Sequence, residues 1–382
     1  MSEVDSSAAD PYEMYRYLRT HAPVTQMPDN GPWQVARFND VHQLLKDYKT
    51  FSSDVSMQPP EERQPGMLFS DPPIHNRLRK LVSYAFKPSY IAAQHDMIVR
   101  RCEQLVGEMV GQGEVDLVET LAAPLPVTVI AHMLGVVDGD MKTFKYWSDQ
   151  IFSNIGEFLF GVPSEEAQRC SEDMNGYFLE RIAELRRKPV NHVLGRLVET
   201  ETEDGKLSDE ELLSFCRLLL IAGNETTTGL ITASVRIFDE MPETFDQVRE
   251  KPALIPTFIE EALRYYSPFA ATIRRTTRVV EIAGVTIPQG ALVTPLIGCA
   301  NRDETVFARA DRFVIDRDPN PHLAFGFGIH NCLGAHLARL EGEIAVAALT
   351  RHFRTLSLSQ SVDAAEGSGL GGPKKLMVRL AA

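Results

Sequence analysis

The feature that most constrains this chain is a single cysteine in a glycine-bent turn directly before a helix. The turn spans residues 322–335 and contains Gly326, Gly328 and Cys332. Glycines allow backbone conformations that a side chain would forbid. Apolar residues from Leu333 to Leu349 recur at three- and four-residue steps, which predicts a helix. Cys332 then lies at a helix N-terminus, where amide groups and the helix dipole favour a thiolate. Such a thiolate can be a nucleophile or a metal ligand; the alternative is a small buried residue in a tight turn.

Composition narrows the class of protein. The chain has 382 residues, is 44% hydrophobic and carries a net charge of −13, which argues against nucleic acid as a general partner. Its five cysteines are scattered, without a Cys-x-x-Cys pair, so neither a zinc site nor covalently attached haem is indicated. Residues 1–10 lack a signal-peptide pattern, and no apolar run approaches the roughly 20 residues of a membrane span. We therefore expect a cytoplasmic protein with no membrane contact.

A second unusual stretch lies inside a long predicted helix. A capping box at Ser208–Glu211 opens this helix, and Pro242 follows its end. Its centre contains Gly223 and three consecutive threonines at 226–228, which are poor helix formers. A threonine hydroxyl can also compete for backbone carbonyls and loosen the helix. Residues that disfavour a helix, placed in the middle of an apolar helix, indicate a functional role for this segment.

Four motifs follow one another along the chain: Asp-Pro-Pro-x-His at 71–75, Ala-Gly-x-Glu-Thr at 222–226, Glu-x-x-Arg at 261–264 and Phe-x-x-Gly-x-x-x-Cys-x-Gly at 325–334. In this order and spacing the chain resembles the cytochrome P450 family, in particular its bacterial soluble type, which uses a separate ferredoxin. The resemblance implies a mainly α fold with a small β subdomain and a kink in the central helix. It also implies haem b between that helix and the cysteine loop.

The expected organisation is a single domain over residues 1–382. Its β-rich part is expected at roughly 30–60 and 275–300, with a C-terminal hairpin, and the remainder is expected to be α-rich. The resemblance makes Cys332 the axial ligand of the haem iron. Other positions that match the family's haem contacts are His75, Arg79, Arg274, Phe325, Gly326, His330 and Gly334. Arg275 is kept as an alternative to Arg274 for a haem propionate.

The resemblance also assigns roles on the central helix. Ala222 and Gly223 would leave room beside the iron for O₂, Thr226 would hydrogen-bond the bound oxygen, and Glu225 would relay protons. A buried structural network is expected from Glu261, Arg264 and Arg312. Candidates for the substrate pocket are Leu68, Phe152, Ile221, Ala270, Ala271 and Leu370. The alternative for Leu68 is that it only fixes its own loop, and the alternative for Phe152 is that it belongs to the core.

The implied reaction inserts one oxygen atom of O₂ into a hydrophobic small molecule, such as a steroid, a terpenoid or a fatty-acid-like compound. Electrons would come from NAD(P)H through a ferredoxin reductase and a ferredoxin, and the protein would be a monomer. Residues 72–95 carry four basic side chains and no acidic one, which predicts a docking face at Arg77, Arg79, Lys80 and Lys87. The alternatives are an H₂O₂-driven peroxygenase, a non-catalytic haem sensor or carrier, and a helical scaffold without cofactor.

Overall fold

The computed structural model describes residues 11–56, 66–137, 140–154, 164–203, 205–360 and 371–381. Leu370 lies outside these residues, and of Phe152 only the helical backbone is described. The described α-helices are α1 Pro11–His21, α2 Phe38–Lys46, α3 Ile74–Ala85, α4 Pro88–Ala93, α5 His95–Met109, α6 Pro124–Leu134, α7 Met141–Ser153, α9 Glu165–Arg187, α10 Val193–Glu199, α11 Asp209–Glu240, α12 Pro242–Glu250, α13 Ile255–Tyr266, α14 Ile297–Ala300 and α15 Ala335–His352. A mainly α fold with small sheets confirms the predicted fold class.

The β part gathers strands from both ends of the chain. A five-stranded sheet has the order β1 (Val24–Gln26), β2 (Trp33–Val35), β10 (Leu292–Pro295), β7 (Arg274–Thr276) and β3 (Phe51–Ser52). The other sheets are β11 (Thr355–Leu358), β12 (Met377–Ala381) and β4 (Glu114–Asp116), then β5 (Glu201–Thr202) with β6 (Gly205–Lys206), and β8 (Val280–Ile282) with β9 (Val285–Ile287). The strand β4, which the sequence analysis did not predict, pairs with β12 beside the C-terminal strands.

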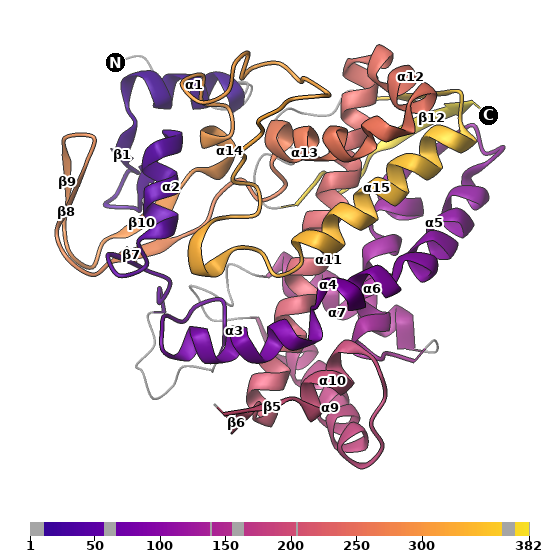
Figure 1. Ribbon diagram of the computed structural model, residues 1–382, viewed down its shortest axis with the longest axis horizontal. Helices are drawn as coiled ribbons and strands as arrows, with labels where there is room; N and C mark the ends of the chain where they lie inside the picture. The colour runs from indigo at the N-terminus through magenta and orange to yellow at the C-terminus, as the bar shows by residue number, and fades with distance from the viewer. Residues whose placement is uncertain are drawn as a thin grey trace.

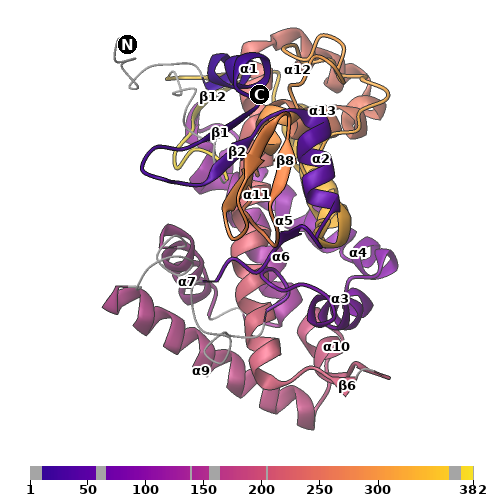
Figure 2. The ribbon, with the colours of Figure 1, turned by 90° about the vertical axis from the view of Figure 1, so that its left-hand side faces the viewer.

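Helix α11 is the element around which the others are arranged. It runs through the molecule in both views, with α15 crossing beside it and the five-stranded sheet on one side (Figures 1 and 2). Its start is fixed by the predicted capping box, in which Ser208 Oγ accepts from the Glu211 amide and Glu211 accepts from the Ser208 amide. The helix is continuous over Asp209–Glu240, so the kink that the resemblance implies does not divide it.

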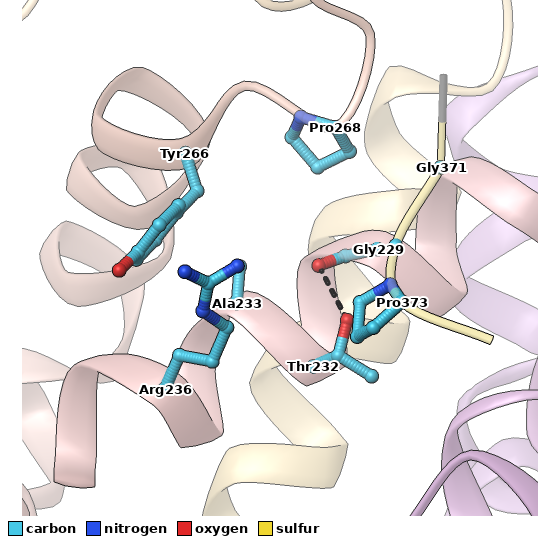
Figure 3. A pocket seen from close by; sticks show the side chains of 9 residues that line it. Gly229, Thr232, Ala233, Arg236, Tyr266, Pro268, Gly371 and Pro373 are labelled. Carbon is cyan, nitrogen blue, oxygen red and sulfur yellow. Dashed lines mark hydrogen bonds between the residues drawn. The ribbon is translucent and has the colours of Figure 1, made fainter. Parts of the chain in front are cut away.

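The C-terminal segment packs closely on the backbone of α11. Figure 3 shows Gly371 and Pro373 lying over Gly229 and Thr232, with Arg236 and Tyr266 on the other side of the small pocket. A Cβ atom added to Gly229 would lie 2.9 Å from the Gly371 carbonyl group. Glycine at this position therefore allows the returning chain to pack directly on the helix backbone.

A buried carboxyl group lies on the inner face of α15. Glu341 is 1% exposed, and its Oε2 atom has no hydrogen-bond partner among the described residues. Burial raises the pKa of this carboxyl group to about 8. The group is therefore mostly protonated near neutral pH, because an isolated buried carboxylate is much more costly than a neutral acid.

Replacing Glu341 by Gln should change the pH dependence of stability. Between the ordinary pKa and the raised one, the unfolded chain loses the proton while the folded chain keeps it, so stability falls as pH rises. We expect E341Q to gain free energy of unfolding over the wild type between about pH 5 and about pH 8, by up to roughly 1.4 kcal/mol per pH unit. Denaturant unfolding at several pH values measures this, with the exposed Glu13→Gln as control. A pH-independent difference would contradict the assignment.

Candidate functional site

The Cys332 loop is shaped by two glycines in the left-handed region. Gly326 has φ +66° and Gly328 has φ +74°, and a Cβ atom on Gly328 would lie 2.6 Å from the Leu45 carbonyl oxygen of α2. Any other residue at 328 would clash with backbone that cannot move aside. The Cys332 amide donates to the Phe325 carbonyl at 2.9 Å, which closes the loop. The local chemistry thus fixes where the sulfur lies.

The Cys332 side chain is accessible to solvent, yet protein atoms surround it closely. Burial raises the pKa of its thiol, while the Gly334 amide and the charges of Arg79 and Arg339 lower it. The net direction is upward, so these groups alone do not hold a thiolate. A cation bound at the sulfur would supply the missing stabilisation, because a thiol that ligates a metal ion is deprotonated. The position suits a metal ligand better than a free nucleophile.

Arg339 is a site residue that the sequence analysis missed. It lies seven residues after Cys332, in the second turn of α15, forms an ion pair with Glu260 at 2.6 Å and has its guanidinium carbon 4.4 Å above the Phe325 ring. Its position early in the helix that follows Cys332 was the signal that the sequence offered. Phe325 thus packs between the loop and a cation directed toward the sulfur.

Four cationic or titratable side chains converge beside the loop. His75 and Arg79 come from α3, Arg274 from β7 and His330 from the cysteine loop. The rings of the two histidines lie 4.1 Å apart, and both Nε2 atoms are buried with no hydrogen-bond partner among the described residues. The pKa of His330 is lowered to about 3, first by burial and then by the charges of His75, Arg274 and Arg79. No described carboxylate forms a hydrogen bond or an ion pair with either Nε2 atom.

Only one carboxylate of the described chain has a resolved electrostatic effect on this cluster. It is Asp71, whose charge opposes the shifts of Arg274 and His75. Its oxygens already accept hydrogen bonds from the Ser52 hydroxyl and the Ser53 amide. The cluster therefore has room for a ligand that carries carboxylates of its own.

The two candidate arginines of β7 have different environments in the structure. Arg274 is 8% exposed, and burial lowers the pKa of its guanidinium to about 10. Its neighbour Arg275 points away and donates to the carbonyls of Val55 and Asp54. Side chains of consecutive strand residues point to opposite faces, so only one of them can join the cluster. That residue is Arg274.

The middle of α11 exposes one small residue. Ala222 is exposed, although most of the helix is buried, and Thr226 donates its hydroxyl to the Ala222 carbonyl at 2.7 Å. Gly223 does not share this space: a Cβ atom there would lie 2.5 Å from Ile130 Cδ1 of α6. The expectation that Gly223 leaves room for O₂ is therefore corrected, because this glycine accommodates a neighbouring helix. Ala222 is exposed at the open space, and Ile221 and Thr226 beside it are half-buried.

Glu225 lies on the side of α11 that faces α7 and the C-terminal segment. Its Oε2 atom is 3.5 Å from the position that a Cβ atom on Gly371 would take. Burial raises the pKa of its carboxyl group, the charge of Asp149 adds to this, and Lys145 and Lys374 oppose it. A carboxyl group between charged surface residues and the Thr226 turn can accept and release protons.

The pocket candidates fall into different environments. Ile221 is half-buried beside Ala222, and Leu68 is 46% exposed. Ala270 is 4% exposed and lies against Gly298 of α14, so the structure corrects its assignment to the pocket wall. Ala271 is half-buried against the cluster of Leu18, Ala36, Leu296 and Cys299.

A buried ion-pair network holds the segment that leads to the cysteine loop. Glu261 and Arg264 are both fully buried, with Arg264 Nη2 2.7 Å from Glu261 Oε1. The third side chain is Arg317, whose Nε atom lies 2.9 Å from Glu261 Oε2, and not Arg312. Arg312 is exposed and contributes only its carbonyl oxygen, which accepts from Arg264.

Two residues of the predicted basic face form ion pairs within the chain. Arg77 pairs with Glu211 at 2.6 Å, and Lys80 pairs with Glu203 at 2.7 Å. Arg79 is directed toward Cys332, and only Lys87, above the Tyr84 ring, is exposed without a carboxylate partner among the described residues. The acids come from α11 and from the loop between β5 and β6, which the local composition of residues 72–95 could not show.

Comparison with known proteins agrees with this geometry. The family model described as Cytochrome P450 matches residues 34–378. The chain belongs to the cytochrome P450 family. It is 38% identical to the putative cytochrome P450 YjiB of Bacillus subtilis over 98% of this chain and 94% of that protein. It is 34% identical to the 6-deoxyerythronolide B hydroxylase of Saccharopolyspora erythraea, over 94% of this chain and 93% of that protein.

A solved structure shows the same architecture. The crystal structure of CYP109E1 from Bacillus megaterium in complex with testosterone matches with a TM-score of 0.87 and 35% identity, over 97% of this chain and 99% of that one. This cytochrome P450 is thus a monooxygenase of a haem-dependent family. The buried Nε2 atoms of His75 and His330, with Arg79 and Arg274 beside them, fit the carboxylates of haem, and Cys332 fits its iron. No helix of the described residues is both long and apolar enough to cross a membrane.

The two arginines of β7 provide a matched test of the haem site. Arg274→Gln should release haem to apomyoglobin about tenfold faster than the wild type, because a charge-assisted hydrogen bond is lost. Arg275→Gln should release it at the wild-type rate, since this guanidinium bonds the carbonyls of residues 54 and 55. Equal rates for the two variants would place the cofactor's carboxylates elsewhere.

Proposed function

We propose that this protein binds haem b through Cys332 and inserts one oxygen atom of O₂ into a hydrophobic small molecule. The observation that carries the proposal is the pair of buried, unpartnered histidine nitrogens between two arginines, beside a loop that presents a single accessible sulfur. When bound, haem supplies the iron at which O₂ is activated, and a thiolate ligand favours cleavage of the O–O bond. His75, Arg79, Arg274 and His330 would hold its propionates.

The residues of α11 supply protons in this proposal. Thr226 holds a hydroxyl at the open space next to Ala222, and in the free protein this hydroxyl donates to a backbone carbonyl. Glu225, with its raised pKa, is protonated more readily than an ordinary glutamate and stands next to Lys145, Asp149 and Lys374. Protons pass from solvent through Glu225 to the hydroxyl of Thr226. This pair favours O₂ activation over a peroxygenase, which takes its oxygen from H₂O₂ and needs no such relay, and over a non-catalytic haem carrier.

The proposed substrate class is lipophilic: a steroid, a terpenoid or a fatty-acid-like compound. Support comes from the described apolar residues near Ala222 and from relatives whose names include a hydroxylase and a testosterone complex. Electrons would come from NAD(P)H through a ferredoxin reductase and a separate ferredoxin. Of the predicted docking residues, Lys87 is the one that the structure leaves available, and we keep the cytoplasm as the proposed location.

Cys332→Ser tests the ligand directly. The variant should lose the red-shifted absorption band that thiolate ligation gives the ferrous carbon monoxide complex, because a serine hydroxyl does not form an equivalent bond. The buried Cys170→Ser in α9 serves as control and should keep the band. Reduced, CO-treated proteins are compared by absorption spectroscopy, and persistence of the band in Cys332→Ser would exclude this residue as the ligand.

Thr226→Ala tests the proton path and the use of O₂ together. The variant should keep haem but form less product per NADPH, by a factor of about ten at least, because electrons are diverted to peroxide. Thr226→Ser, which keeps the hydroxyl, should restore coupling. The measurement compares product, NADPH and peroxide for the compound that gives the largest spin-state shift in a lipophilic panel. Efficient turnover with H₂O₂ and none with the ferredoxin system would instead favour a peroxygenase.

A further inference from the structure

A groove separate from the Cys332 site lies between α5, α6 and the start of α7. Its cavity volume is about 290 Å³, just below the range of roughly 300–1,000 Å³ typical of small-molecule pockets. One part of the lining is cationic and polar, with Arg100, Arg101 and Thr128, and another is apolar, with Met97 and Met141. The lining contains no carboxylate among the described residues. This is unusual in a chain with a net charge of −13.

The guanidinium of Arg101 is held in place by neutral groups. Its Nε atom donates to Thr128 Oγ1 at 3.3 Å, and its Nη1 atom donates to Gln104 Oε1 at 3.0 Å. The Thr128 hydroxyl is itself fixed, because it donates to the Pro124 carbonyl at 2.7 Å. Two of the five donors of the guanidinium are thus used for orientation, and its charge is not neutralised by these contacts. A guanidinium held in this way is prepared for a carboxylate.

We propose that this groove binds a small amphiphilic carboxylate. The carboxylate would pair with Arg101 and Arg100, and the apolar part would lie on Met97 and Met141, whose flexible thioethers adapt to different shapes. Inorganic phosphate can pair with the arginines but has no apolar part to contact the methionines. An uncharged alcohol can contact the methionines but cannot pair with the arginines. A ligand needs both a negative charge and an apolar part to contact the whole lining of the groove.

The groove is distinct from the proposed active site. Helix α6 stands between them: Thr128 faces the groove, while Ile130 packs against Gly223 of α11. A ligand in the groove therefore contacts different side chains from a substrate near Ala222. This separation allows binding to be measured residue by residue, whatever the substrate of the enzyme is.

Octanoate is a suitable probe of the groove. The full-length haem-loaded protein, labelled with ¹³C at its methionine methyl groups, is titrated with octanoate, and the signals of Met97 and Met141 are assigned by Met→Leu substitution. We expect saturable shifts of these two signals. The double variant R100Q/R101Q should raise the dissociation constant at least tenfold, while Arg16→Gln on the exposed side of α1 should leave it unchanged.

Matched ligands complete the test. Octanol, with the same chain and no charge, and inorganic phosphate, with charge and no chain, should each bind at least tenfold more weakly than octanoate. Thermal unfolding of each variant shows that the fold is intact. The proposal is overturned if octanoate shifts neither signal, if the double variant binds it as tightly as the wild type, or if octanol or phosphate binds equally well.

Discussion

The buried pair of Glu261 and Arg264 is the interaction on which the position of the cysteine loop depends. Both side chains are fully buried, and removing a charge from water is costly unless it is paired and hydrogen-bonded. Here Arg264 donates to the carbonyls of Asn301, Ala310 and Arg312, and Glu261 accepts from Arg317. Those groups lie along an irregular segment between α14 and α15. The ion pair therefore fixes the path of a chain that has no regular structure, and this path ends at Cys332.

Features set by local chemistry could be predicted from the sequence. The capping box of α11, the turn around Gly328 and the position of Cys332 before α15 all follow from residues close to one another in the chain. Arg312 was assigned to the ion-pair network because it resembled a family motif. The irregular segment turns so that Arg317 reaches Glu261, and five residues of loop have no periodicity from which this could be predicted.

Features set by packing partners could not be predicted in the same way. Helical spacing shows that Gly223 and Ala222 face different directions, but not which one meets α6 and which one meets open space. Ala270 likewise is small because Gly298 of α14 approaches it, and not because a pocket needs volume there. A small residue indicates a close neighbour, and only the tertiary structure identifies that neighbour.

The basic residues show that the role of a charged side chain depends on the groups around it. Arg77 and Lys80 meet carboxylates within the chain and are neutralised. Arg274 and Arg79 lie near the histidines instead, and the pKa of His330 falls to about 3 because burial and the like charges around it oppose its protonation. An anion bound there reverses the second effect, so anion binding and proton uptake by the histidines are coupled. Asp71 is the one carboxylate among the described residues with a resolved effect on this buried cluster, so an anionic ligand would supply most of the charge that balances it.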